Sequence, residues 1–282
     1  MLNKFSDHIY YLPNQDENDR PTLGLVCGDR YSLIIDCGNS TQHAKEFLRE
    51  IEKLNVPPVK YAVITHAHWD HFLGMNEFEA TVIVNRQTND RLKEWQSYQF
   101  DDDSLQTYVH TKQISAKCAE IIKSEIPNRD RFKLNEPDLI FEEKVTIDLG
   151  NKVCVLETIN STHSDDATIV YIPDEKVIFL GDSVYGTTTN ALFHYKQSLL
   201  MPMIKDIQQY HAEAFLLGHE SICDLEEMTK FWRELIAASK ATTSSSLEKA
   251  IESFQLENKR KPNDDELFFI KAFVNDHILQ SL

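Results

Sequence analysis

Thr65-His66-Ala67-His68-Trp69-Asp70-His71 stands directly after an apolar run at residues 59–64. The run has the length and the β-branched and aromatic content of a buried strand. Functional side chains of α/β proteins gather at the carboxyl ends of such strands. Three imidazoles and one carboxylate are therefore predicted at a place in the fold where binding sites form.

The spacing of these side chains indicates a metal site. On a continuing helix His66 and His68 would point to nearly opposite sides, because two residues correspond to about 200° of rotation. The two rings converge only on a strand end or a tight loop. A single histidine is more often an ordinary polar residue. Four ligand-type side chains crowded into a partly buried loop are costly without a partner, and a bound cation supplies one.

Three further ligand-type residues lie at or near the ends of later predicted strands, and they are His163, Asp182 and His219. Each alone is weak evidence, since such residues also suit turns. Together with the first cluster they make five histidines and two aspartates, enough for two metal ions that share a bridging ligand. Imidazole and carboxylate accept zinc, iron and manganese alike. We expect two divalent ions, with zinc first and iron or manganese as alternatives.

The composition is that of a folded protein with an acidic surface. Hydrophobic residues make up 41% and charged residues 26%, and the net charge is −16. Such a surface repels polyanions, so nucleic acids and membranes are not expected as partners. The sequence begins without a signal-peptide pattern, contains no run near the ~20 apolar residues that span a bilayer, and has five scattered cysteines. We expect a cytoplasmic protein with reduced thiols.

Periodicity predicts a strand-rich part followed by a helical part. Strands are predicted at 8–12, 22–27, 31–35, 59–64, 81–84, 144–149, 153–159, 167–172, 176–180 and 213–217. The first three form an antiparallel meander, and Gly150-Asn151 is a hairpin-turn candidate. Residues 86–138 lose the strand pattern and are predicted to form a helical insertion that covers the site. Beyond residue 222 apolar residues recur at helical spacing.

These patterns predict a domain at 1–222 and a helical C-terminal extension at 223–282. The apolar faces of the extension serve either as core or as the contact of a homodimer. Together with residues 86–138, they are the expected walls of the substrate pocket.

The ligand pattern resembles the metallo-β-lactamase superfamily, in the binuclear hydrolase branch that includes glyoxalase II-type thioesterases and acyl-homoserine-lactone lactonases. The likeness extends over about residues 6–222, and the residues that carry it are His66, His68, Asp70, His71, His163, Asp182 and His219. It implies an α/β fold, a four-layer αββα sandwich with the site at one edge. It also implies that one metal is held by His66, His68 and His163. The second is then held by Asp70, His71 and His219, with Asp182 bridging the two.

Departures from the family pattern narrow the choice of branch. Ser161-Thr162 stands where Pro-Gly is common. Secreted β-lactamases lack a bridging aspartate at the position of Asp182, which argues against antibiotic resistance. Diiron flavoproteins have an acidic residue at the position of His68, which argues against that branch.

The resemblance implies hydrolysis of a small ester, lactone or thioester. Two neighbouring cations lower the pKa of a bridging water from ~15.7 towards ~7 and give hydroxide at neutral pH. Asp182 would hold the pair, and Asp70 could also orient the hydroxide. Tyr185, three residues after Asp182, resembles the lactonase Asp-x-x-Tyr arrangement, in which the phenol stabilises an oxyanion. A tyrosine packed at a strand end fits the same spacing equally well.

Three alternatives use the same residues and also take a small-molecule ligand. The metal pair of a phosphoesterase clamps a displacement at phosphorus. A persulfide dioxygenase-like oxidoreductase has this fold with a single iron. A non-catalytic, metal-stabilised binder has the metals and no turnover. Asp165 and Asp166 either orient a ligand or solvate their loop.

Overall fold

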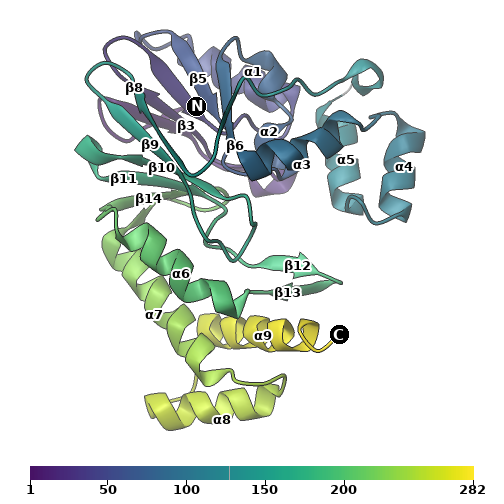
Figure 1. Ribbon diagram of the computed structural model, residues 1–282, viewed down its shortest axis with the longest axis vertical. Helices are drawn as coiled ribbons and strands as arrows, with labels where there is room; N and C mark the ends of the chain where they lie inside the picture. Colours follow the sequence, from purple (N-terminus) through teal and green to yellow (C-terminus); the bar gives the residue numbers. More distant parts are fainter. Residues whose placement is uncertain (127) are drawn as a thin grey trace.

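Two β-sheets packed face to face form the centre of the molecule, and helices cover both outer faces (Figure 1). The computed structural model describes residues 1–126 and 128–282. In Figure 1, α6 (Gln197–Gln208) and α7 (Leu225–Ala241) lie below the second sheet, whereas α1 (Thr41–Ile51) lies beyond the first. The predicted α/β sandwich is confirmed.

The first sheet has seven strands, and their order across the sheet follows the chain. They are β1 (Asn3–Lys4), β2 (Ile9–Leu12), β3 (Leu23–Cys27), β4 (Ser32–Ile35), β5 (Val59–Val63), β6 (Thr81–Asn85) and β7 (Leu139–Phe141). Neighbours from β1 to β4 are antiparallel, which confirms the predicted meander, and neighbours from β4 to β7 are parallel. The parallel pairing of β4 with β5 brings their carboxyl ends side by side.

The second sheet has six strands in the order β15–β14–β11–β10–β9–β8. They are β8 (Lys144–Asp148), β9 (Val153–Thr158), β10 (Thr168–Ile172), β11 (Val177–Gly181), β14 (Ala214–Leu217) and β15 (Cys223–Asp224). The predicted turn joins β8 to β9, and Gly150 there has a φ of 122°, a conformation that residues with a side chain rarely adopt. β11 and β14 are parallel, so these carboxyl ends also meet.

A separate hairpin, β12 (Thr187–Thr189) and β13 (Leu192–His194), was not predicted. It follows β11 and packs against α9 (Asp264–Leu279). His194 fixes this packing, because its Nδ1 lies 3.0 Å from the carboxylate of Asp276 on α9.

Side-chain caps start most of the helices. Ser40 accepts a hydrogen bond from the amide of His43 at the start of α1, and Asp224 and Asn263 form reciprocal capping boxes on α7 and α9. Ser246 caps α8 by accepting a hydrogen bond from the amide of Lys249. The remaining helices are α2 (Trp69–Phe72), α3 (Arg86–Gln96), α4 (Asp102–His110), α5 (Ala116–Glu125) and α8 (Leu247–Asn258), with short 3₁₀ turns at Asp16–Asn18, Met75–Glu77, Arg129–Arg131 and Pro173–Glu175.

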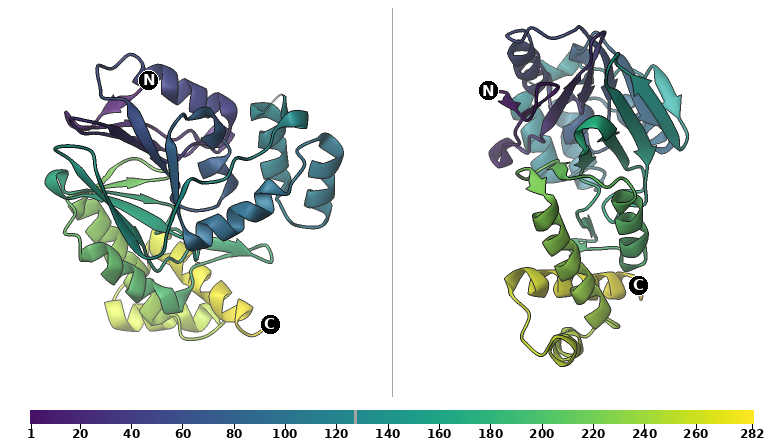
Figure 2. Two further views of the ribbon diagram at one scale, coloured as in Figure 1. Left: turned by 45° about the horizontal axis from the view of Figure 1, so that its top comes forward. Right: turned by 90° about the vertical axis from the view of Figure 1, so that its left-hand side faces the viewer.

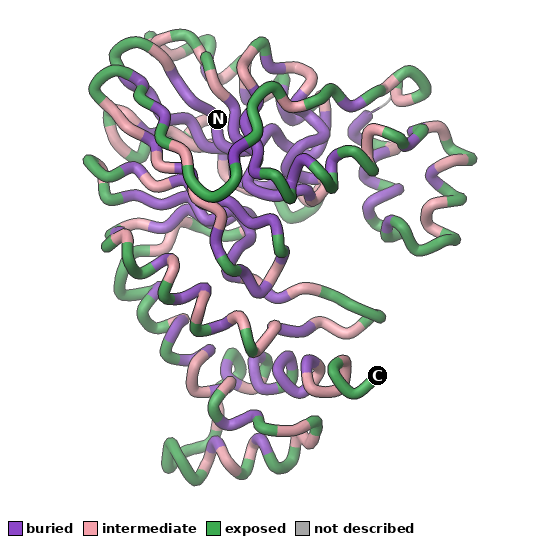
Figure 3. The backbone as a smooth tube through the Cα atoms, in the orientation of Figure 1, coloured by how far each residue is buried: buried purple, intermediate pink, exposed green. Residues whose placement is uncertain are grey.

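Three apolar cores hold the layers together. One lies between the sheets, one between the first sheet and the helices around α1, and one between the second sheet and α6, α7 and α9. Phe47 of α1 and Phe273 of α9 are fully buried in the two outer cores. Each such side chain contributes about 1.5–3 kcal/mol relative to exposure. Figure 3 shows the buried residues concentrated in the strands and on the inner sides of the helices.

Residues 86–138 carry α3, α4 and α5, and residues 223–282 carry α7, α8 and α9. The helices α4 and α5 project from one side of the sandwich, whereas α8 and α9 lie beneath the second sheet (Figure 2). Because α7 and α9 share an apolar core with the second sheet, the tail packs on the sandwich. The division of the chain at residue 222 stays a prediction. In the described part of the chain, no helix is long and apolar enough to cross a membrane.

Candidate metal centre

The histidine motif occupies the segment that leaves the first sheet. β5 ends at Val63, His66 and His68 lie in the following loop, and Asp70 and His71 lie on the single turn of α2. His68 precedes this turn with an extended backbone (ψ of 141°), so the rings of His66 and His68 are not separated by helical rotation. Their centroids are 4.5 Å apart.

The other three predicted ligands come from the second sheet. His163 lies in the loop between β9 and β10, Asp182 directly follows β11, and His219 follows β14. All seven side chains meet at the same edge of the sandwich. Their ligand atoms form two groups, and within each group the atoms lie within 4.8 Å of one another. The groups are His66, His68, His163 and Asp182, and Asp70, His71, Asp182 and His219.

Asp182 lies at the junction of the two groups. Its Oδ2 is 3.5 Å from the Nε2 atoms of His71, His163 and His219 and 3.9 Å from Nε2 of His66. The side chain is 4% exposed. Space for its carboxylate depends on Gly218, because a Cβ there would lie 2.0 Å from Asp182 Oδ1.

Buried carboxylates orient the loop that carries the motif. Asp36, at the end of β4, lies 2.8 Å from Nδ1 of His71 and accepts hydrogen bonds from the amide and hydroxyl of Thr65 at 2.8 and 2.9 Å. Asp166 accepts from the amide of Ala67 at 2.8 Å. Asp166 thus positions the motif, whereas its neighbour Asp165 is 60% exposed and pairs with Lys196.

The electrostatics differ between the two groups. Burial, with the neighbouring imidazoles adding to it, lowers the pKa of His66 and lowers that of His68 to about 4. Burial also lowers the pKa of His219, but Asp182 and Asp70 outweigh it and raise the value to about 10. One group therefore offers mainly neutral ring nitrogens, and the other offers carboxylates whose charge is balanced by imidazolium.

A cation fits both groups. Nε2 of His66, Nε2 of His71 and Oδ1 of Asp182 are buried and have no hydrogen-bond partner among the described residues. Orphaned buried donors and acceptors are costly, and a metal ion satisfies nitrogen and oxygen lone pairs together. Imidazole with carboxylate is a ligand set for divalent ions such as zinc, iron and manganese. The assignment of individual ligands stays a prediction.

Tyr185 lies beside the centre rather than within either ligand group. Its hydroxyl accepts a hydrogen bond from the amide of His219 at 3.3 Å, and its ring meets that of His163 edge-on with centroids 6.4 Å apart. Burial, and then the charge of Asp182, raises the pKa of the phenol. The hydroxyl therefore keeps its proton and remains able to donate a hydrogen bond.

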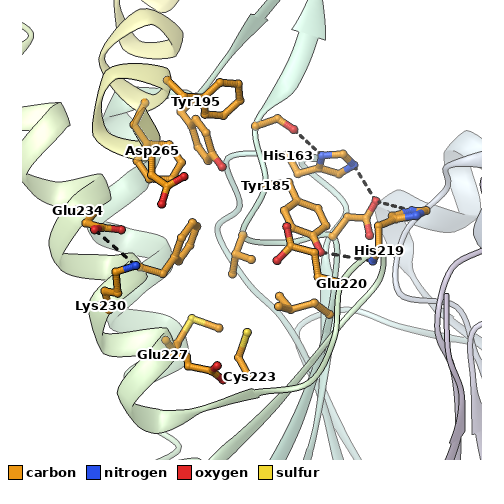
Figure 4. Close-up of a pocket in the computed structure, with 18 of the residues that line it drawn as sticks. His163, Tyr185, Tyr195, His219, Glu220, Cys223, Glu227, Lys230, Glu234 and Asp265 are labelled. Atoms are coloured by element: carbon orange, nitrogen blue, oxygen red, sulfur yellow. Dashed lines mark hydrogen bonds and ion pairs between the residues drawn. The ribbon is translucent and has the colours of Figure 1, made fainter. Parts of the chain in front are cut away.

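A cavity of about 750 Å³ opens beside the centre (Figure 4). Its lining begins at His163, Asp182 and His219 and extends along α7 and α9 to the β12–β13 hairpin. The prediction that C-terminal helices form a wall is confirmed. The prediction that residues 86–138 also form one is wrong for this cavity, because α3, α4 and α5 pack beside the first sheet instead.

Sequence reasoning missed three residues of the site. Asp36 was not recognised, although an aspartate directly after a buried strand, in the same position as Asp182, is a usable signal. Phe193 and Tyr195, from the unpredicted hairpin and the segment after it, line the cavity. No local pattern marks these two residues.

Comparison with known proteins identifies the class. The family model described as "Metallo-beta-lactamase superfamily" matches residues 20–219. The sandwich and its two candidate ligand groups fit this family. The chain belongs to the metallo-beta-lactamase superfamily.

Curated relatives share part of the sequence. The chain is 22% identical over 193 residues to "Acyl-coenzyme A thioesterase MBLAC2" of Homo sapiens, with 64% of each chain covered. The protein of the same name from Gallus gallus is 22% identical over 183 residues, with 60% of each chain covered. The chain thus spans less than two thirds of the length of the relatives it matches.

Solved structures are similar in fold. A metallo-beta-lactamase from Pontibacter korlensis has a TM-score of 0.57 at 18% identity, covering 83% of this chain and 97% of that one. The sec-alkylsulfatase Pisa1 from Pseudomonas sp. has a TM-score of 0.65 at 12% identity, covering 100% of this chain and 50% of that one. At these identities the likeness supports the fold alone.

Proposed function

We propose that this chain is a binuclear metal-dependent hydrolase that cleaves a small ester, lactone or thioester. The observation that carries the proposal is the pair of ligand groups sharing Asp182 at the end of an open cavity. A single-iron oxygenase would need only one of the groups. The printed name of the relatives, acyl-coenzyme A thioesterase, supports carbonyl chemistry and favours the thioester.

In this proposal His66, His68 and His163 would hold one ion, Asp70, His71 and His219 would hold the other, and Asp182 would be within reach of both. We propose zinc, with iron and manganese as alternatives. When bound, such a pair supplies a water of lowered pKa and polarises a carbonyl oxygen. The ring of His163 is fixed for this task by the carbonyl of Gly186, 2.7 Å from its Nδ1. That contact sets the tautomer in which Nε2, 2.9 Å from Nδ1 of His68, carries a lone pair rather than a proton.

Asp70 and Tyr185 are the proposed groups around the reacting carbonyl. Asp70 Oδ2 is 3.0 Å from Nε2 of His219, and its side chain is 10% exposed. A carboxylate held there can accept a hydrogen bond from the attacking water and align its lone pair with the carbonyl carbon. The protonated phenol of Tyr185 lines the cavity and can donate to the oxygen on which negative charge develops.

The role of Tyr185 is tested by Tyr185→Phe, which removes one hydroxyl from a ring that otherwise keeps its packing. We expect kcat to fall about 10-fold or more with little change in KM, because the lost hydrogen bond acts on the transition state. Steady-state kinetics on a hydrolysed ester measures both constants. An unchanged kcat would leave Tyr185 as a packing residue at the end of its strand.

Metal content is the first test of the whole proposal. Elemental analysis should find about two metals per chain in the wild type and fewer in Asp182→Ala. Glu213→Gln, at an exposed carboxylate paired with Lys176, is the matched control and should keep both. Circular dichroism checks that each variant is folded. One iron per chain that is insensitive to Asp182 would overturn the binuclear centre.

A substrate panel then identifies the reaction. It should include aryl esters, γ-lactones, phenyl thioesters, an acyl-coenzyme A and bis(p-nitrophenyl) phosphate. Carbonyl substrates should be turned over and should lose turnover in Asp182→Ala. Cleavage of the phosphodiester without any carbonyl activity would replace the proposal with a phosphoesterase.

We also propose a homodimer through the C-terminal helices. Leu225 and Leu256 there are 52% and 81% exposed, which supports an uncovered apolar surface. Sedimentation velocity tests the state of the purified chain. A monomer at micromolar concentration would contradict it.

A further inference from the structure

We infer that the cavity selects an acyl group that is largely apolar and carries a positive charge. The inference rests on the proposed hydrolytic function and names the substrate class of the same site. It follows from the charge balance of the walls, their aromatic rings and the place where the cavity begins.

The cavity begins at the candidate metal centre. Asp182, His163 and His219 line its inner end. The reacting carbonyl would therefore sit at this end. Whatever is attached to the carbonyl extends away from the centre, between α7 and the β12–β13 hairpin (Figure 4).

The walls beyond the centre carry an excess of negative charge. Apart from the candidate metal ligands, the lining holds four carboxylates and one ammonium group, so its formal charge is −3. The carboxylates belong to Glu220, Glu227, Glu234 and Asp265, and the ammonium group belongs to Lys230. The ammonium group already has a partner, because Nζ of Lys230 is 3.8 Å from Oε1 of Glu234. Among the described residues that line the cavity, no second cation is left to receive an anionic ligand.

Two of these carboxylates are available to a ligand. Figure 4 shows Asp265, on α9, and Glu220, on the loop after β14, facing the space between them from opposite sides. Among the described residues neither forms an ion pair. Glu227, by contrast, accepts from the amide of Asp224 in the cap of α7, and Glu234 accepts from Asn263.

Aromatic rings form the rest of the wall. Phe268 lies between Phe193 and Phe269, with ring centroids at 5.3 and 5.7 Å, and Phe231 and Tyr195 pack on Phe269 at 5.7 and 5.8 Å. Phe268 is 49% exposed, so its ring is accessible. Such rings bury methylene groups and attract cations through their faces. Aromatic rings with unpaired carboxylates are the chemistry that recognises an alkylammonium group.

The same balance disfavours polyanionic groups inside the cavity. A polyanionic group inside the cavity would meet Glu220 and Asp265, and the net charge of −16 adds a long-range repulsion.

Three p-nitrophenyl esters of matched length provide the test, with 6-trimethylammoniohexanoyl, 7,7-dimethyloctanoyl and 6-sulfohexanoyl as acyl groups. The first two are isosteric and differ only in charge. On the metal-loaded wild type we expect kcat/KM for the cationic ester to exceed that for the neutral isostere about 5-fold, and the anionic ester to be the poorest. In Glu220→Gln/Asp265→Asn the ratio of cationic to neutral ester should fall towards 1. Both residues are exposed, so the variant should fold.

Calorimetry gives a second readout that needs no turnover. It compares the affinity of the protein for hexyltrimethylammonium with its affinity for hexane-1-sulfonate. Glu213→Gln is the charge-matched control and should keep the wild-type preference in both assays. A wild-type enzyme that prefers the neutral or the anionic ester, or a double variant with an unchanged ratio, would overturn the inference alone. Absence of hydrolysis for all three esters would count against the proposed function, while calorimetry would still decide the charge preference.

Discussion

Asp36→Asn should separate the stability of the chain from its affinity for metal. Wild-type Asp36 has a φ of 61°, a conformation that aspartate and asparagine tolerate, and it accepts three buried hydrogen bonds. Its Oδ2 lies 2.8 Å from Nδ1 of His71, an arrangement that keeps the proton on Nδ1 and frees Nε2. An amide nitrogen in place of Oδ2 would donate to Nδ1 and move the ring proton to Nε2.

The magnitudes follow from these contacts. Loss of an outer partner of a metal-binding histidine typically costs about 10–100-fold in metal affinity. Asp36→Ala should be worse, because the His71 ring and the Thr65 amide each lose an acceptor, at about 1–3 kcal/mol per buried donor. Alanine in the left-handed region adds about 1–2 kcal/mol. We expect Asp36→Ala to lose about 3 kcal/mol or more, a large part of the roughly 5–15 kcal/mol of a typical domain.

Chelator competition on the folded protein measures metal affinity, and urea unfolding of the metal-free protein measures stability. Asp148→Asn, at an exposed carboxylate paired with Arg30, is the matched control and should leave both unchanged. Wild-type metal affinity in a folded Asp36→Asn would refute the reasoning, because the tautomer of His71 would then not depend on Asp36.

Three further perturbations test the surroundings of the centre. Gly218→Ala should reduce metal content without unfolding the chain, because its Cβ would lie 2.0 Å from Oδ1 of Asp182, and elemental analysis measures this. Arg20→Ala should cost about 3–5 kcal/mol in urea unfolding, because Arg20 is 2.8 Å from the buried carboxylate of Glu125; wild-type stability would contradict this. Burial, with the charge of nearby carboxylates, raises the pKa of the Cys223 thiol from 9.0 to about 11. At pH 8 it should react with iodoacetamide roughly 100-fold more slowly than an unperturbed thiol and accelerate towards pH 10, as followed by mass spectrometry.

Periodicity was sufficient to predict the strands of the sandwich. Most of these strands are buried on one or both faces, and this burial leaves a pattern of apolar residues in the sequence. β3 and β4 are buried at every residue, and both were predicted to within one residue at each end. β7, β12 and β13 have three residues each and are partly exposed, so too few side chains face the core to leave a pattern. Such strands form because their backbone pairs with a neighbouring strand, and the local sequence does not reveal that neighbour.

The residues of the candidate site also differ in whether the sequence could predict them. The ligand-type residues were found because their chemistry is unusual and they follow strands. The place of Asp36 in the site depends on the parallel register of β4 and β5. In this register Ile35 pairs with Val63, and Asp36 therefore faces Thr65. Phe268 and Phe269 reach the cavity only because α9 crosses beneath the second sheet. Helical spacing predicted a helical tail but not which of its side chains border the cavity.

The ligands are divided between the two sheets, and this has a consequence for folding. His66, His68, Asp70 and His71 leave the first sheet, whereas His163, Asp182 and His219 leave the second. Each ligand group takes members from both. A chain emerging from the ribosome therefore has neither candidate ligand group complete until both sheets have formed and docked. Binding of metal to a complete group would thus report that the two sheets have assembled.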